Sequence, residues 1–483
     1  MKRYFKIVPV TGILSSLVLS AAAITAVTHT AAVFPFSGRV VDTNGNGVKG
    51  VVVNNGVDFV ETDANGRWTL PTDTNVCKFV SISTPAEYQL PVEKSVAKGF
   101  YARVDDIIKH ANSHDFVLTR RKKVNDKLWY VVISDPQMRT DSDLKRWLNE
   151  TMTDMRPFVD SLSRKREVVA NTLGDLVWDN MPLFKDYISS LNGMKMTTFQ
   201  CIGNHDFDKR FQDLHNMPVG TPHYAEQYYH RYFGPTNYSY NIGRIHVITL
   251  KNINYIGSIA YVEAITGADM EWLRNDLSYV PKGTTVILNM HAAAWNTVEN
   301  DGNVRQANEL AKVLKDYNVH VFAGHTHYLQ NTVVSDNLME HNIGAACGAW
   351  WDRDVNRCGA PNGYMVVDID GDKLKWHYKS TGHSMSYQMR LYGVGQMKSQ
   401  PEYLVANVWD YDEKGSVEWE QDGKPMGCME QFTDVDEFYA STQGYKKGLT
   451  LTPHLFRAKP SAGAKKIKVI FTNRFGEKYE QSL

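Results

Sequence analysis

The 483-residue chain carries no excess charge of either sign, because 53 Lys and Arg residues balance 53 Asp and Glu residues. Proteins that bind nucleic acid use Lys and Arg to neutralise its phosphates, and a neutral chain has no global basic field for that purpose. We therefore expect no nucleic-acid partner. The charged run at 120–123 is more simply a solvated linker than a nucleic-acid patch.

Two common catalytic signatures are absent from the sequence. No GxSxG stretch marks a serine nucleophile, and no GxxxxGK stretch marks a P-loop. A P-loop enzyme is therefore disfavoured. A serine esterase stays open as an alternative class, and inhibition by a serine reagent rather than by a chelator would identify it.

Cysteine is scarce, and its spacing excludes the usual thiolate zinc site. The five cysteines form no CxxC pair. Their odd number leaves at least one thiol free or paired between chains. Cys347 and Cys358 could form a disulfide in an oxidising compartment, or they could be buried free thiols.

Only the N-terminus has a long apolar run. Lys2, Arg3 and Lys6 precede an apolar stretch at 7–27 that includes the small residues 21–23. This layout predicts a secretory signal peptide at 1–32, with an uncleaved anchor as the alternative. No later segment is apolar enough to span a membrane, so we expect a periplasmic or secreted protein with no membrane span after signal removal.

The remaining chain divides into three regions by its hydrophobic pattern. Residues 33–120 alternate short Val-rich runs with Asn/Gly/Asp turns, which predicts a small β-sandwich. Residues 125–380 alternate apolar runs with helix-like segments, the signature of a layered α/β fold. Residues 385–483 return to short strands, which predicts a second β domain. The predicted class is α/β, with β domains on both sides of the core.

Within the central region the expected strands and helices can be placed. Strands are predicted at 128–133, 168–173, 196–202, 245–250, 285–290 and 319–322, and helices at 142–162, 268–279 and 304–317. The aromatic-rich segment 215–240 is predicted as a long covering loop.

Polar residues with metal-binding chemistry follow five of these strands. In chain order they are Asp135 and Gln137, then Asp175, then Asn204 with His205 and Asp206, then His291, and finally His325 and His327. In α/β sheets, ligand groups collect beyond the carboxyl ends of the strands. A turn could explain any one of these stretches, but it does not explain all five strand ends together.

The ordered set resembles the calcineurin-like metallophosphoesterase family, whose blocks read Asp-x-His, Gly-Asp, Gly-Asn-His-Asp/Glu, a lone His and Gly-His-x-His. The resemblance covers about 128–380, and the flanking β regions suggest the secreted bacterial branch of the family. It implies a metallophosphoesterase core, a β-sandwich flanked by helices. It also implies two divalent ions (Mn, Fe, Zn or Mg) and hydrolysis of phosphomonoesters or phosphodiesters.

The resemblance also assigns roles to residues. Asp135, Gln137 and His327 would hold one ion, and Asn204, His291 and His325 the other, with Asp175 bridging the two. His205 would face the substrate as the general acid, with Asp206 orienting it.

Charge supports this division of roles. Two divalent ions bring four positive charges, whereas Asp135 and Asp175 bring two negative ones, so the site keeps a surplus suited to a hydroxide and a phosphate. Gln137 stands where the family usually has His. Its amide oxygen is neutral but harder than imidazole, which predicts a first site shifted toward Mn or Mg.

The substrate side of the site is less defined by the sequence. Arg139 and Arg353 are candidates for phosphate contacts, and Trp350 and Trp351 for stacking, although an ion pair or domain packing would also explain them. The expected partner is a small phosphoester or an envelope or glycan-linked phosphate. The alternative is a phosphate-binding or adhesive module whose first metal site is weakened by Gln137.

Overall fold

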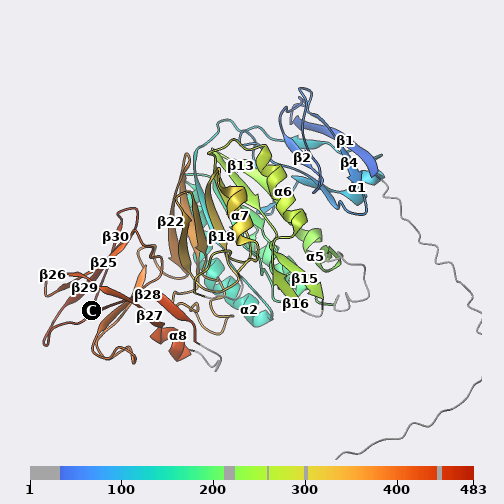
Figure 1. Cartoon of the computed structure of the whole chain (residues 1–483). Coiled ribbons are helices and arrows are strands. Elements are labelled where there is room, and N and C mark those ends of the chain that lie inside the picture. The colour runs from blue at the N-terminus through green and yellow to red at the C-terminus, as the bar shows by residue number, and fades with distance from the viewer. Residues whose placement is uncertain (1–32, 211–222, 258–259, 299–302, 443–448) are drawn as a thin grey trace, which may run out of the picture.

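The computed structural model describes residues 33–210, 223–257, 260–298, 303–442 and 449–483. They form a central core with a β-rich domain at each end of the chain (Figure 1). The signal peptide predicted at 1–32 lies outside the described residues. Among the described helices, none has the length and apolar character needed to cross a membrane.

Two sheets form the core. The first has seven strands in the order β22 (Lys373–Ser380), β21 (Gly363–Asp370), β10 (Lys127–Ile133), β11 (Val168–Thr172), β12 (Thr197–Gln200), β7 (Val96–Ala97) and β6 (Val92–Glu93). The second has six, in the order β13 (Tyr238–Ile242), β14 (Ile245–Thr249), β17 (Thr285–Asn289), β18 (Asn318–Ala323), β20 (Leu338–Asn342) and β19 (Gln330–Ser335). All six strands predicted for the central region are present.

Helices cover the core sheets. They are α2 (Asp141–Arg146), a π-helical turn (Trp147–Thr151), α3 (Met152–Ser163), α4 (Phe184–Leu191), α5 (His223–Phe233), α6 (Gly267–Ser278) and α7 (Ala307–Leu314). Figure 1 shows α6 and α7 against the six-stranded sheet and α2 at the lower end of the core. The helix predicted at 142–162 is therefore interrupted by a π-helical turn. Helix α5 and strand β13 lie where we predicted a long loop, so that prediction is wrong.

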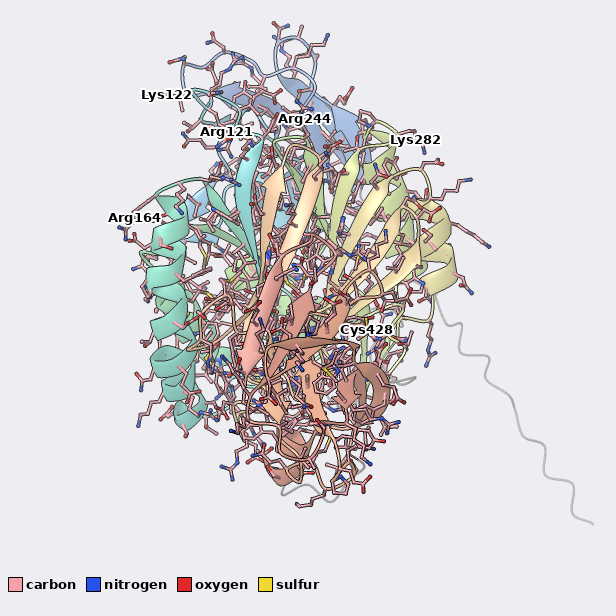
Figure 2. The ribbon with its side chains drawn as sticks, turned by 90° about the vertical axis from the view of Figure 1, so that its left-hand side faces the viewer. Arg121, Lys122, Arg164, Arg244, Lys282 and Cys428 are labelled. Atoms are coloured by element: carbon pink, nitrogen blue, oxygen red, sulfur yellow. The ribbon has the colours of Figure 1, made fainter. Side chains whose placement is uncertain are left out.

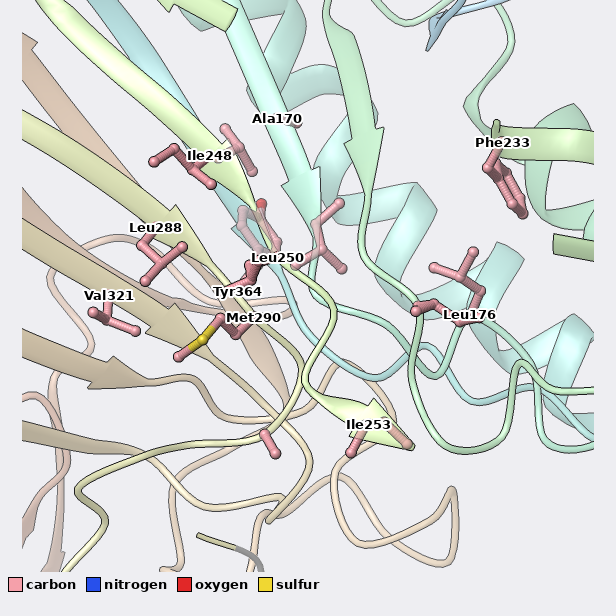
Figure 3. Close-up of a cluster of buried hydrophobic side chains, with 14 of the residues drawn as sticks. Ala170, Leu176, Phe233, Ile248, Leu250, Ile253, Leu288, Met290, Val321 and Tyr364 are labelled. Atoms are coloured by element: carbon pink, nitrogen blue, oxygen red, sulfur yellow. The ribbon is translucent and has the colours of Figure 1, made fainter. Parts of the chain in front are cut away.

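Alternation along the strands separates two hydrophobic layers. In β10, Tyr130 and Val132 belong to the cluster that also holds Phe199 and Tyr240, whereas Val131 and Ile133 belong to the cluster that holds the buried side chains of α3 and α4. Phe199 of one sheet stacks on Tyr240 of the other with ring centroids 3.9 Å apart. Figure 3 shows Ile248, Leu288 and Val321 on neighbouring strands of the six-stranded sheet.

Strand direction gathers the loops of the core at one end. Strands β10, β11 and β12 pair in parallel, and so do β14, β17 and β18. Two polar pairs link the sheets near that end. Tyr130 Oη donates to Asn289 Oδ1 (2.9 Å), and Asn171 Nδ2 donates to Thr249 Oγ1 (3.1 Å). These hydrogen bonds fix the two sheets relative to each other where the loops after the parallel strands begin.

Each terminal domain contains two sheets, which confirms the predicted β domains. The N-terminal sheets are β4 (Arg67–Asp73), β1 (Val33–Asp42) and β9 (Phe116–Leu118), and β3 (Phe59–Glu61), β2 (Val52–Asn54), β5 (Phe79–Ile82) and β8 (Tyr101–Arg103), followed by α1 (Val104–Lys109). The C-terminal sheets are β23 (Met389–Tyr392), β24 (Leu404–Val408), β28 (Leu451–Ala458) and β27 (Glu430–Val435), and β26 (Lys424–Cys428), β25 (Ser416–Gln421), β29 (Ile467–Thr472) and β30 (Lys478–Ser482), with α8 (Glu437–Thr442).

The N-terminal region also contributes to the core. Strands β6 and β7 fall within the range predicted for the first domain, yet Val96 pairs with Thr198 and extends the seven-stranded sheet. All five cysteines lie in the described part of the chain as free thiols, so Cys347 and Cys358 are not bridged.

Surface cations are matched by nearby acids at the end of the core that adjoins the N-terminal domain. Figure 2 shows Arg121, Arg244 and Lys282 there. They pair with Glu167 (2.5 Å), Asp126 (3.0 Å) and Asp316 (2.7 Å), respectively. These three cations are therefore paired with carboxylates of the core.

The packing of β17 gives a stability prediction. Leu288 is fully buried, so Leu288→Ala should lower the free energy of unfolding by about 2–5 kcal/mol through lost contacts and a cavity. Leu148 is 40% exposed, and Leu148→Ala should change it by less than ~0.5 kcal/mol. Urea unfolding followed by tryptophan fluorescence measures both. Equal shifts for the two variants would contradict the assigned core.

Candidate metal centre

Backbone strain is concentrated in the loops that follow the parallel strands. Five of the predicted ligands there have positive φ: Asp135 (47°), Gln137 (43°), Asp175 (47°), His325 (70°) and His327 (52°). Asp179, in the loop after β11, has positive φ as well (54°). The left-handed region costs an L-residue roughly 1–2 kcal/mol, and such residues gather where a site over-determines the backbone. The strain therefore coincides with the residues predicted as metal ligands.

Four predicted ligands of the second ion converge around one nitrogen. His291 Nε2 lies 3.0 Å from Asn204 Oδ1, 3.1 Å from His325 Nδ1 and 3.4 Å from Asp175 Oδ1. Ligand atoms bound at about 2.0–2.2 Å to one ion are separated by roughly 3.0–3.5 Å. Asp175, His291 and His325 also stand out as a compact group of possible metal ligands. The donor set and its spacing fit a divalent cation.

The histidines are held in the tautomer that a ligand requires. His291 Nδ1 donates to the Leu173 carbonyl (2.8 Å), and His327 Nδ1 donates to the Gly348 carbonyl (2.6 Å). Burial lowers the pKa of each to about 3, so both rings are neutral and their Nε2 lone pairs are available.

The residues predicted for the first site, Asp135, Gln137, His327 and Asp175, also lie close together. His327 Nε2 lies 3.7 Å from Asp135 Oδ1, and Gln137 Nε2 lies 3.0 Å from Asp175 Oδ2. The thiol of Cys347 lies 3.6 Å from Gln137 Oε1. Turning the amide by 180° would direct Oε1 toward Asp175 and Nε2 toward the thiol, which is the orientation that a cation would select.

Among the described residues, neither buried carboxylate forms an ion pair with a Lys or Arg side chain. Asp135 and Asp175 are 0% and 1% exposed, and in the described part of the chain their ion-pair partners are His327 and His291. Asp135 Oδ1 has no hydrogen-bond partner there. Burial raises the pKa of both carboxyls. An orphaned buried carboxylate oxygen is costly, and bound cations would satisfy it.

Glycine is required where the loops cross one another. A Cβ at Gly203 would lie 2.2 Å from Asp175 Oδ1, and one at Gly324 would lie 2.5 Å from Asp135 Oδ2. The Gly-Asn-His and Gly-His-x-His blocks therefore begin with glycine because the carboxylates occupy the space of a side chain.

His205, the predicted proton donor, lies against a different acid from the one we predicted. His205 Nδ1 lies 3.0 Å from Asp179 Oδ1, and Asp179 N donates to the His205 carbonyl (3.0 Å). The ring also packs against Trp178, with centroids 4.9 Å apart. Because Nδ1 faces Asp179, Nε2 is the nitrogen left to face a substrate.

The prediction that Asp206 orients His205 is wrong. Asp206 is fully buried, and it accepts hydrogen bonds from the backbone N–H groups of Leu176 and Gly203, both at 2.9 Å. Its carboxylate therefore joins the loop after β11 to the loop after β12. It has a structural role behind the site.

The predicted substrate contacts occupy different environments. Arg139 is exposed and its guanidinium lies 5.5 Å from the Trp178 ring, at the side of His205. The Trp350 ring lies 4.9 Å from that of His327. Trp351 is 7% exposed and donates to the Pro136 carbonyl (2.9 Å), so it packs under the loop and does not stack on a substrate. Arg353 is exposed, and its role stays a prediction.

Sequence reasoning missed a hairpin beside the second site. Strands β15 (Ile253–Gly257) and β16 (Ala260–Glu263) form it, and Glu263 Oε1 lies 3.3 Å from His325 Nε2. Burial acts to lower the pKa of His325, but the Glu263 hydrogen bond and nearby carboxylates outweigh it and raise the pKa. No motif marks Glu263. Only the contact in the folded chain reveals it.

Sequence comparisons match three consecutive segments to one family. Residues 35–121 match the N terminal of calcineurin-like phosphoesterase, residues 128–329 match calcineurin-like phosphoesterase, and residues 340–479 match its C terminal. The chain belongs to the calcineurin-like phosphoesterase family. Members of this family generally bind a pair of divalent metal ions.

Solved structures give distant likenesses. A dimetal phosphatase from Danio rerio is 11% identical with a TM-score of 0.37, covering 53% of this chain and 97% of that protein. A structure of PhoD is 9% identical with a TM-score of 0.35, covering 93% and 85%. A 5'-nucleotidase from Candida albicans is 14% identical with a TM-score of 0.32, covering 54% and 53%. No significant match occurs among curated proteins.

The glycine packing of this family member gives a test of the candidate metal centre. Gly203→Ala should displace Asp175 and lower metal affinity about tenfold or more, because supporting contacts of a metal site are typically worth that much. Gly267→Ala is the matched control, since a Cβ there meets nothing within 4 Å. Equilibrium dialysis against Mn with elemental analysis measures both variants. Unchanged Mn binding by Gly203→Ala would contradict the site.

Proposed function

We propose that the protein is a dinuclear metal-dependent phosphoesterase that acts on phosphomonoesters or phosphodiesters. One observation carries the proposal: Asp175, 1% exposed, lies between two sets of candidate ligands, and together with them it comes from five strand-end loops. We assign Asp135, Gln137 and His327 to one ion, and Asn204, His291 and His325 to the other. Two bound divalent ions would supply a water of lowered pKa and neutralise phosphoryl charge.

The residues around the ions would orient the substrate and supply the proton. His205 donates Nδ1–H to Asp179 and directs Nε2–H toward the leaving oxygen. As water attacks phosphorus, the bond to the leaving oxygen breaks, its electron pair stays on that oxygen, and Nε2 gives up its proton. Arg139 at the rim is placed to contact a phosphate oxygen.

The N-terminal sequence supports export. A short basic segment followed by an apolar stretch at 7–27 is the layout of a signal peptide. Exogenous or envelope phosphoesters, including glycan-linked phosphates, are therefore the proposed substrates.

Turnover tests the proposed activity. Mn-reconstituted protein should hydrolyse an aryl phosphomonoester or phosphodiester, and a chelator rather than a serine reagent should abolish the activity. On an alkyl phosphoester, whose leaving oxygen needs a proton, His205→Ala should lower kcat by about 10²–10⁴-fold while two ions remain bound, because it removes a proton donor and no ligand. His110→Ala, at an exposed position, is the control. Loss of metal in His205→Ala would contradict its role, and no turnover by wild type would favour a phosphate-binding module.

Gln137 predicts a metal preference. Replacing its amide oxygen with imidazole in Gln137→His should raise affinity for Zn relative to Mn, because nitrogen is the softer ligand. Titration of both proteins with Zn, Fe and Mn measures the preference. Identical metal profiles would show that Gln137 does not set it.

A further inference from the structure

Lys209 is a nearly buried cation beside the proton-transfer residues. Its side chain is 11% exposed, and its ammonium donates to the Asn204 carbonyl (2.6 Å). The same nitrogen lies 3.9 Å from Asp179 Oδ1, the atom that faces His205 Nδ1. Lys209 therefore contacts the backbone of a metal ligand and the acid that orients His205.

An aromatic platform holds this cation. The ammonium lies 4.8 Å from the ring centroid of Tyr255, 5.8 Å from that of Tyr261 and 5.9 Å from that of Phe207. Cations over aromatic rings are stabilised electrostatically, most strongly when they are desolvated. Tyr255 and Tyr261 come from the two strands of the β15–β16 hairpin. The hairpin therefore holds the Lys209 ammonium, although it is distant in sequence from the loop that carries Lys209.

The same hairpin contacts the second metal site. Tyr261 packs edge-on against His325, with ring centroids 5.9 Å apart, and Glu263 accepts a hydrogen bond from His325. One two-stranded element therefore supports a metal-ligand histidine on one side and the cation near His205 on the other. Side-chain contacts of Tyr261 and Glu263 with His325, and of Tyr255 with Lys209, set the position of the hairpin relative to these two residues.

We propose that Lys209, held on the β15–β16 hairpin, is a positioning residue for His205 and that the substrates are alkyl or sugar phosphoesters. This inference rests on the proposed phosphoesterase activity. The ammonium attracts the Asp179 carboxylate and holds the Asn204 carbonyl, which together keep His205 Nε2 directed at the leaving oxygen. An alkoxide is strongly basic and needs that proton as it departs, whereas a nitrophenolate leaves without it.

Leaving-group dependence separates this role from a purely structural one. On Mn-reconstituted protein, Lys209→Met should lower kcat about 10–100-fold for glycerol phosphate or glycerophosphocholine, a part of the typical contribution of a general acid. For the p-nitrophenyl ester of the same class the loss should be less than about threefold, because its leaving group needs little proton transfer. Two Mn ions should stay bound. Lys282→Met, at an exposed position, is the matched control.

Further variants keep the test decisive. Lys209→Arg retains a cation over the rings and should recover part of the alkyl-ester activity, and Asp179→Asn combined with Lys209→Met should lose little more than Asp179→Asn alone. If Lys209→Met does not fold, Lys209→Gln replaces it in the same comparison.

Each contrary outcome has a distinct meaning. Equal losses on both esters, lost Mn or unchanged kcat in the Lys209 variants would overturn the positioning role. Wild-type activity on nitrophenyl esters without activity on any alkyl ester would overturn the substrate class and leave the phosphoesterase proposal intact. No wild-type activity on any ester would overturn the phosphoesterase proposal itself.

Discussion

The burial of Asp135 and Asp175 is the constraint on which the site depends. Both carboxylates are excluded from water, and their ion-pair partners in the described part of the chain are histidines. Isolated buried charges of one sign are unfavourable unless a cation joins them. The neutral histidine tautomers, the positive φ angles and the tightly packed Gly203 all maintain a space that suits metal ions. The described residues thus form a site whose donors and charge fit metal ions.

The two-sheet core places these residues next to one another. Parallel strands from both sheets end at one edge, and polar pairs such as Tyr130–Asn289 connect the sheets close to it. Each candidate ligand therefore lies only a few residues beyond the end of a strand of the core. Asp206 joins two of these loops by accepting N–H groups from both. The hairpin β15–β16 is a separate addition that supports His325 through Glu263.

The sequence predicted the parts of the site that lie in local motifs, and the reason is physical. A strand followed by Gly and a polar residue places that residue at the sheet edge whatever the rest of the chain does. The prediction that Asp206 orients His205 was based on their adjacency in the chain. In the folded chain, the left-handed backbone at Asp179 brings the Asp179 carboxylate to the His205 ring instead. Lys209 and the hairpin could not be predicted, because their roles arise from contacts between residues distant in sequence. The π-helical turn in the predicted 142–162 helix has no sequence signal that we can identify.

The central claim is that Asp175 bridges two divalent ions. Anomalous diffraction from crystals of the Mn-loaded protein tests it most directly. The account predicts two Mn peaks about 3.5–4 Å apart, one on each side of the Asp175 carboxylate. One peak should contact Asp135, Gln137 and His327, and the other Asn204, His291 and His325. A single peak away from Asp175, or no peak among these residues, would contradict it.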